Sequence, residues 1–129
     1  MTSIINEALE AVIGLMNATN PFATVTRGAL PLGNGITCEL GPSSPEEVYL
    51  DKKNYIPLDV TINGKHTDLK ILSDDLNKIH DTLTRMTSYP SGTGWEIDDI
   101  SNQTMPQVVE REASNAWIMA SALQVKLYY

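Results

Sequence analysis

The segment Tyr55–Met86 reads YIPLDVTINGKHTDLKILSDDLNKIHDTLTRM, and its hydrophobic period changes part-way along. In its first part apolar and polar residues alternate, with apolar positions at Leu58, Val60 and Ile62. A period of two is typical of a half-buried strand. The dipeptide Asn63-Gly64 then favours a tight hairpin turn, because both residue types tolerate a positive φ. We therefore expect a strand, a turn and a return strand over Lys65–Leu72.

The second part of the segment has the period of a helix. Its apolar residues are spaced by three and four, at Leu76, Ile79, Leu83 and Met86. They follow Ser73-Asp74-Asp75, a group of residues of the kind that begins a helix. A strand, a turn, a return strand and a helix in one short segment predict a small sheet backed by a helix. The segment contains no reactive group, so it predicts an architecture and not a chemistry.

Helix and strand patterns also precede this segment. Residues 3–17 carry a continuous apolar stripe of helical period, formed by Ile4, Ile5, Ala8, Leu9, Val12, Ile13 and Met16. Asn20-Pro21 is expected to end that helix. A short extended piece is expected at Thr24–Thr26, and a strand at Ile36–Leu40 with Cys38 on its apolar face.

The last third of the chain is expected to be mostly strand. Trp95, Ile97 and Ile100 predict a short strand in a region that ends at Pro106. Between Asn115 and Tyr129, large apolar residues fall on odd positions and predict a long strand that closes the sheet. Three alanines in its first half, Ala116, Ala120 and Ala122, leave a helix open as the alternative there. Together the elements predict an α+β fold with a mostly antiparallel sheet, two helices packed on it, and a single domain over residues 1–129.

Composition narrows the classes of function. The chain has 129 residues, a formal net charge of −7 and only nine Lys and Arg residues, so stable binding to DNA phosphates is not expected. An acidic surface can still form the wall of a channel through which DNA slides without sticking. Cys38 is the single cysteine, which excludes an intramolecular disulfide and fits a cytoplasmic or virion setting. We expect no secretion signal and no membrane partner, because no leader pattern and no apolar run of about 20 residues is present.

The residues that could carry chemistry favour ordinary structural roles. His80 has Thr84, not a second ligand, four residues further on, so we interpret both His80 and His66 as solvated or partner-contacting, not metal-bound. Cys38 is expected to be a buried, inert thiol. The paired acids, such as Asp98-Asp99, are interpreted as solvated faces. We therefore predict no catalytic, cofactor-binding or metal-binding residue, and no enzyme activity.

One alternative from another class stays open. The chain could be a small cytoplasmic binding domain or a hydrolase, with a pocket formed around His80, Asp98 and Asp99. The sequence contains no recognisable pair of nucleophile and base, which weighs against this alternative.

Two regions are candidates for contacts with partners. Gly41–Lys53 is expected to be a long surface loop, and its candidate contact residues are Tyr49, Lys52 and Lys53. The closing strand places aromatic residues on both of its faces, and its candidates are Trp117, Tyr128 and Tyr129. We expect the edge of the sheet near that strand to contribute to a subunit interface.

The order of these elements resembles that of the tail-terminator and neck proteins of long-tailed bacteriophages and prophages. The resemblance rests on the helix from Ile4 to Met16, the segment Val48–Asp51, the strand and helix from Leu58 to Met86, the segment Trp95–Ile100 with Pro106, and the closing strand to Tyr129. It covers nearly the whole chain, and it is a likeness of layout and length, without a signature motif.

The resemblance implies a structural virion protein without enzyme activity or cofactor. Members of that family form hexameric rings that cap the completed tail tube and offer a surface to the head connector. The implied partners are further copies of the chain in a homohexamer, the tail tube protein and the head connector or stopper protein, with DNA passing through the ring unbound. The implied location is the tail or neck of a virion assembled in the host cytoplasm. Within the same class, a head-completion (stopper) or minor capsid protein is the alternative.

Overall fold

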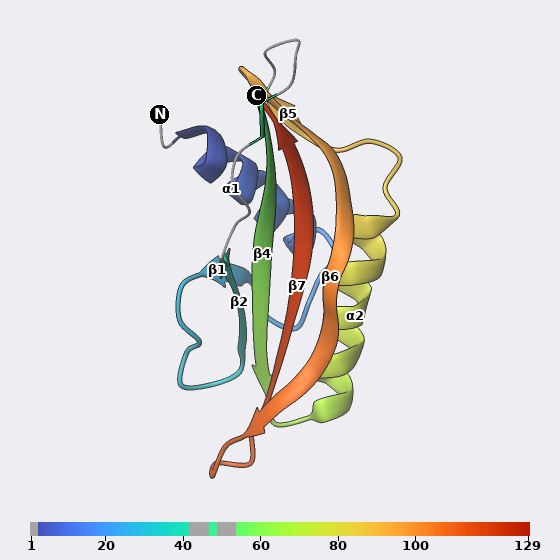
Figure 1. Cartoon of the computed structure of the whole chain (residues 1–129). Helices are drawn as coiled ribbons and strands as arrows, with labels where there is room; N and C mark the ends of the chain where they lie inside the picture. The colour runs from blue at the N-terminus through green and yellow to red at the C-terminus, as the bar shows by residue number, and fades with distance from the viewer. Residues whose placement is uncertain (1–2, 42–46, 49–53) are drawn as a thin grey trace.

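The computed structural model describes residues 3–41, 47–48 and 54–129, and its fold is α+β (Figure 1). Helices α1 (Ser3–Asn17) and α2 (Leu69–Thr84) pack on one sheet. The strands are β1 (Val25–Arg27), β2 (Gly35–Leu40), β3 (Glu47–Val48), β4 (Asn54–His66), β5 (Ser91–Gly92), β6 (Trp95–Arg111) and β7 (Trp117–Tyr128). They lie in the order β1-β2-β4-β7-β6-β5, with β3 also paired to β4. Only β1 and β2 pair in parallel among these strands, which confirms the expected fold class.

The hairpin turn predicted at Asn63-Gly64 does not form. β4 continues through this dipeptide, and Asn63 pairs with Thr37 of β2 on one side and with Ala120 of β7 on the other. Two neighbouring strands satisfy the backbone of β4 there, so pairing overrides the local turn preference. Gly64 is required at this position for packing and not for a turn. A Cβ there would lie 2.6 Å from Cδ1 of Leu72. The glycine therefore lets α2 approach the sheet closely.

Helix α2 begins earlier than expected. Asp68 precedes its first turn, and its carboxylate accepts hydrogen bonds from the backbone N–H groups of Lys70 (3.0 Å) and Ile71 (3.3 Å). Such an N-cap satisfies two donors that have no partner within the helix. The predicted start at Ser73-Asp74-Asp75 is therefore wrong by one turn, and the second half of the expected return strand, Leu69–Leu72, is helix.

Both helices contribute to the same hydrophobic core, so both cover the same face of the sheet. The predicted face of α2 is confirmed, because Leu72, Leu76, Ile79 and Leu83 are fully buried. The apolar stripe of α1 is buried too, at Ala8, Leu9, Val12, Ile13 and Met16. The sheet meets them with alternate residues of paired strands, such as Leu58 opposite Val125 and Val60 opposite Leu123.

Cys38 joins this core with 1% of its surface exposed. Burial raises the pKa of its thiol to about 12, so the thiolate that would react is strongly disfavoured at neutral pH. The interpretation of Cys38 as a buried thiol is confirmed.

The closing strand exists as predicted, but it is not at an edge. β7 pairs with β4 along one side and with β6 along the other, which excludes the helical alternative for its first half. The expectation of a free edge along the closing strand is therefore wrong. On this side of the sheet the edge belongs to β6, which pairs with the short β5 only at Trp95 and Glu96.

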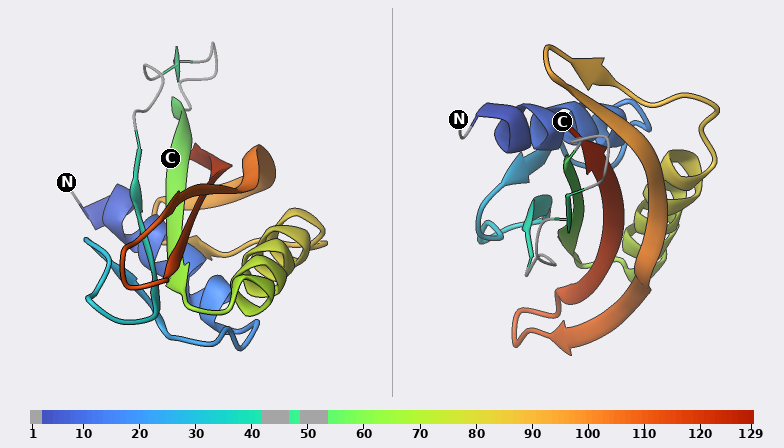
Figure 2. Two further views of the ribbon diagram at one scale, coloured as in Figure 1. Left: turned by 90° about the horizontal axis from the view of Figure 1, so that it is seen from below. Right: turned by 45° about the horizontal axis from the view of Figure 1, so that its top comes forward.

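The sequence pattern predicts that this strand region ends at Pro106. That prediction is wrong, because β6 runs on to Arg111. Pro106 lies where the register shifts between Thr104 and Gln107, and on an edge strand its missing N–H can face away from the ladder. Ile97 of β6 pairs with Leu127 of β7, and Arg111 pairs with Trp117. Between these two pairs β6 advances by 14 residues and β7 by 10, so β6 has one extra residue at each of its four register shifts. Such bulges bend a strand, and Figure 2 shows β6 curving along the outside of the sheet.

Candidate functional site

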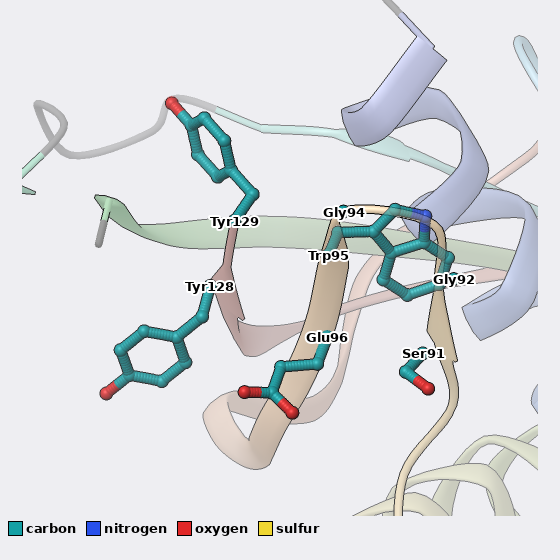
Figure 3. Close-up of a pocket in the computed structure, with 7 residues that line it drawn as sticks. All are labelled: Ser91, Gly92, Gly94, Trp95, Glu96, Tyr128 and Tyr129. Atoms are coloured by element: carbon teal, nitrogen blue, oxygen red, sulfur yellow. The ribbon is translucent and has the colours of Figure 1, made fainter. Parts of the chain in front are cut away.

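An open pocket of about 330 Å³ lies at one end of the sheet (Figure 3). Its lining residues are Ser91, Gly92, Gly94, Trp95, Glu96, Tyr128 and Tyr129. The pairing of Glu96 with Tyr128 brings the β5–β6 hairpin and the end of β7 together there. A Cβ on Gly92 would lie 2.4 Å from Nε1 of Trp95, so this glycine allows the backbone to lie against the indole ring.

The pocket is aromatic, with an exposed carboxylate at Glu96. Trp95 is 7% exposed, and its indole N–H points to Oε1 of Glu7 on α1 at 3.4 Å. Figure 3 shows Tyr128 and Tyr129 directed to different sides at the end of β7. Two of the predicted contact residues, Tyr128 and Tyr129, therefore line the pocket.

The other predicted contact residues do not join them. Trp117 lies at the opposite end of β7, about 35 Å away at about 3.3 Å per residue. There the Arg111 guanidinium carbon lies 4.6 Å from the centre of the indole ring, a cation–π arrangement on an exposed arginine. Tyr49, Lys52 and Lys53 lie outside the described residues, as does most of the expected loop Gly41–Lys53.

Near the Trp117 end, a buried lysine ties two loops to the sheet. Nζ of Lys65 on β4 lies 2.7 Å from Oε1 of Glu112 and 3.3 Å from the carbonyl oxygen of Pro31. The hydrogen bond from Lys65 lowers the pKa of Glu112. The sequence gives no sign of this role, because Lys65 occupies a polar position of the alternating pattern.

His80 is buried, which contradicts its interpretation as solvated or partner-contacting. Its Nδ1 lies 2.8 Å from Oδ1 of Asn102 on β6, and its Nε2 lies 2.8 Å from Oγ of Ser121 on β7. Because Oδ1 can only accept, Nδ1 carries the proton and Nε2 accepts from the Ser121 hydroxyl. Burial lowers the pKa of His80, which keeps the ring neutral. The helical position explains the error, since residue 80 falls on the same face as Leu76 and Leu83.

The Ser121 hydroxyl and the His80 imidazole are ordered as in the triad of serine hydrolases, but an amide stands in place of the carboxylate. The group is also closed to a substrate. His80 is 0% and Ser121 4% exposed, and neither lines the pocket at the other end of the sheet. A nucleophile must reach its substrate, so the geometry instead fastens α2 to β6 and β7. The expected alternative pocket of His80 with Asp98 and Asp99 does not form, because the ring nitrogens of His80 face Asn102 and Ser121.

Residues 3–41, 47–48 and 54–129 form neither a metal centre nor a membrane-spanning helix. In this part of the chain, no group of three or more His, Cys, Asp or Glu side chains could hold a metal ion. No helix among these residues is long and apolar enough to cross a membrane.

Exposed apolar side chains form a feature that the sequence patterns missed. Three of them lie on β6, where Met105 is 50%, Val108 45% and Val109 54% exposed. Leu32, in the loop between β1 and β2, is 100% exposed. Lack of charge does not mark these positions in the sequence: residues 28–38 and 100–109 contain no Asp, Glu, Lys or Arg, but neither do residues 11–26 and 113–125.

Comparisons with known proteins bear on the fold. No family model matches the chain, and no curated protein matches its sequence. Among solved structures, a chain of the "Virion of native gene transfer agent (GTA) particle" matches with a TM-score of 0.63 and 11% sequence identity. The match covers 100% of this chain and 95% of that one. The two chains share a fold. The likeness extends over all the elements of this chain.

Proposed function

We propose that this chain is a structural virion protein, a tail terminator that forms a ring, caps the tail tube and joins it to the head connector. The observation that carries the proposal is the likeness to a virion chain of the gene transfer agent particle over all of this chain and 95% of that one. The layout resemblance to terminator and neck proteins supports the finer role.

The described side chains support a structural role. The strongest candidate for catalysis, the group of Ser121, His80 and Asn102, is used to hold α2 on the sheet. Lys65, a buried cation, holds two loops by binding Glu112 and Pro31. In both cases the polar groups are satisfied within the fold, so they are not available to a substrate.

The charge also agrees with this proposal. With a net charge of −7, a ring of such subunits is acidic overall, and an acidic wall repels the phosphates of passing DNA. The ring would therefore let DNA slide through without holding it. The number of six subunits comes from the family resemblance.

The test is to produce particles from a genome that lacks this gene and to image them by electron microscopy. Loss of a terminator leaves tails that are not capped, so we expect tails of uncontrolled length separate from filled heads. Tails of normal length beside heads that lose DNA would instead assign the stopper role. Normal infectious particles would overturn the virion role altogether and favour the small binding domain or hydrolase.

A further inference from the structure

Two loops from separate parts of the chain meet on one buried lysine. Loop 28–34 joins β1 to β2, and turn 112–116 joins β6 to β7. Figure 1 shows both segments toward the end of the sheet that lies away from the C-terminus. Nζ of Lys65 lies 3.3 Å from the carbonyl oxygen of Pro31 in the loop and 2.7 Å from Oε1 of Glu112 in the turn. We call Pro31, Lys65 and Glu112 the lysine clamp.

The lysine clamp lies on the face of the sheet that the helices do not cover. The even-numbered apolar residues of β4, such as Ile62, belong to the core shared with the helices, so Lys65 points to the other face. Its partners in the neighbouring strands, Gly35 and Ile118, carry no charge. The side chain of Lys65 is only 6% exposed, although a lysine ordinarily keeps its charged end in water. Its ammonium group contacts the two loops, so the loops take it out of solvent.

A buried cation depends on its carboxylate. Removing one partner of a buried ion pair leaves an uncompensated charge. Pro31 offers only a neutral carbonyl group, whereas Glu112 offers a full charge, and the hydrogen bond from Lys65 lowers the pKa of Glu112. Without that carboxylate the ammonium group has to regain water. The loop that contacts it through Pro31 then cannot keep its place.

Loop 28–34 also packs closely on the sheet beside Lys65. A Cβ on Gly35 would lie 2.6 Å from Cγ and 2.9 Å from Cδ of Pro31. Because the ring of a proline is rigid, only a glycine at this position lets Pro31 lie so close to β2. Packing on Gly35 and the bond to Lys65 therefore hold the same residue of the loop.

We propose that the lysine clamp couples loop 28–34 to turn 112–116, so that releasing either segment releases the other. In the clamped state the ammonium group of Lys65 is buried between the two segments. In the released state both segments have moved off it and water surrounds it. Coupling of this kind is reciprocal, so a change in the turn must alter the loop, and the reverse. The coupling is a property of the single chain and does not depend on the proposed virion role.

The first test changes the turn and observes loop 28–34 by NMR in the full chain. Glu112→Gln keeps the size of the side chain and removes its charge. We expect the backbone order parameters of residues 32–34 to fall from about 0.85 to below about 0.6. The acetylation rate of Lys65, relative to that of Lys70, which is 82% exposed, should rise about fivefold or more. Glu110→Gln is the matched control, because Glu110 is exposed on β6 and loses the same charge.

The second test changes the loop and observes the turn. Gly35→Ala forces Pro31 away from β2, and Gly33→Ala is its control, because a Cβ on Gly33 meets nothing within 4 Å. We expect Gly35→Ala to speed hydrogen exchange at the amide of Asn115, which donates to the carbonyl oxygen of Glu112 at 2.9 Å. The control should leave that rate unchanged. If Glu112→Gln does not fold, this second test decides alone.

A third variant shows whether Lys65 carries the coupling. Lys65→Met keeps a side chain of similar length and removes the charge, so no unpaired cation is left in the fold. In the Lys65→Met background, Glu112→Gln should cause no further change in the order parameters of loop 28–34.

Three results would overturn the coupling. If loop 28–34 stays rigid in Glu112→Gln while the turn loosens, water reaches Lys65 through the turn alone. If Glu112→Gln still loosens the loop in the Lys65→Met background, the clamp is not the connection. Equal effects of Glu110→Gln and Glu112→Gln would reduce the result to a general loss of negative charge. None of these results bears on the virion role, which is tested on assembled particles.

Discussion

Strands β4 and β6 both contain a residue pattern that favours a break, and neither strand ends there. In β4 the pattern is Asn63-Gly64, and the strand stays regular, with matched pairs to β2 and β7. In β6 it is Pro106, and the strand continues only with shifted register. β4 is an interior strand and β6 is an edge strand. Two neighbours impose regular pairing on β4, whereas one neighbour lets β6 absorb irregularity as bulges.

The same division separates buried from exposed apolar side chains. The apolar residues of β4, Ile56, Leu58, Val60 and Ile62, are almost completely buried. The β6 edge keeps Met105, Val108 and Val109 about half exposed. Substitutions on the two sides should therefore differ in their effect on stability, with larger losses near β4 and smaller ones on β6.

The largest effect on stability is expected from Leu83→Ala. Leu83 is 0% exposed on the face of α2 that packs on the sheet, and its truncation leaves a cavity that costs about 2–5 kcal/mol. Chemical denaturation followed by circular dichroism measures this loss. Val109→Ala on β6 is the control, and it should change stability by less than about 0.5 kcal/mol. Equal losses at the two positions would remove the distinction between the buried and the exposed side.

A smaller loss is expected from Gly64→Ala in β4. The new Cβ would lie 2.6 Å from Cδ1 of the buried Leu72, and overpacking of this kind costs about 1–3 kcal/mol. Gly33→Ala in the loop between β1 and β2 is the control, because a Cβ there meets nothing within 4 Å. If Gly64→Ala proved as neutral as the control, α2 would not depend on this glycine for its approach to β4.

The sequence predicts elements well where one local pattern decides them. The apolar stripes of α1 and α2 are buried as the helical period requires, because a helix makes its own hydrogen bonds and needs only a face to bury. The strand at Trp117–Tyr128 follows from its period of two. The first turn of α2 was missed because Asp68 caps it before the apolar period becomes clear.

The sequence predicts poorly what depends on partners distant in the chain. Whether Asn63-Gly64 turns, and whether Pro106 ends a strand, depends on the strands beside them, which no local window contains. His80 was misjudged for the same reason: its two hydrogen-bond partners, Asn102 and Ser121, are 22 and 41 residues away. Of the three candidate contact residues that the structure describes, Tyr128 and Tyr129 come together at the pocket, and Trp117 lies at the other end of β7.

His80 makes a pH-dependent connection between α2 and both β6 and β7. Burial lowers its pKa below the ordinary value of 6.5, so the unfolded chain takes up the proton first as the solution is acidified. The contribution of His80 should therefore be complete above pH 6.5 and should decline as the pH falls below that value. Thermal unfolding between pH 7.5 and pH 5 measures the decline. His80→Gln, which cannot titrate, should flatten this part of the curve, and an unchanged slope would contradict the assignment.

The smallest effect is expected from Pro106→Ala on the β6 edge. Proline restricts the unfolded chain, so its replacement should lower stability by about 0.4–1 kcal/mol. No ladder bond should be gained, because Pro106 lies at a register shift of an edge strand where a new N–H can face away from β7. Denaturation measures the loss, and amide hydrogen exchange at the new alanine should be fast. Slow exchange there would mean that the outer edge of β6 is already paired or covered within one copy. In that case β6 would resemble β4 after all, and the contrast between a buried interior strand and an exposed edge strand would fail.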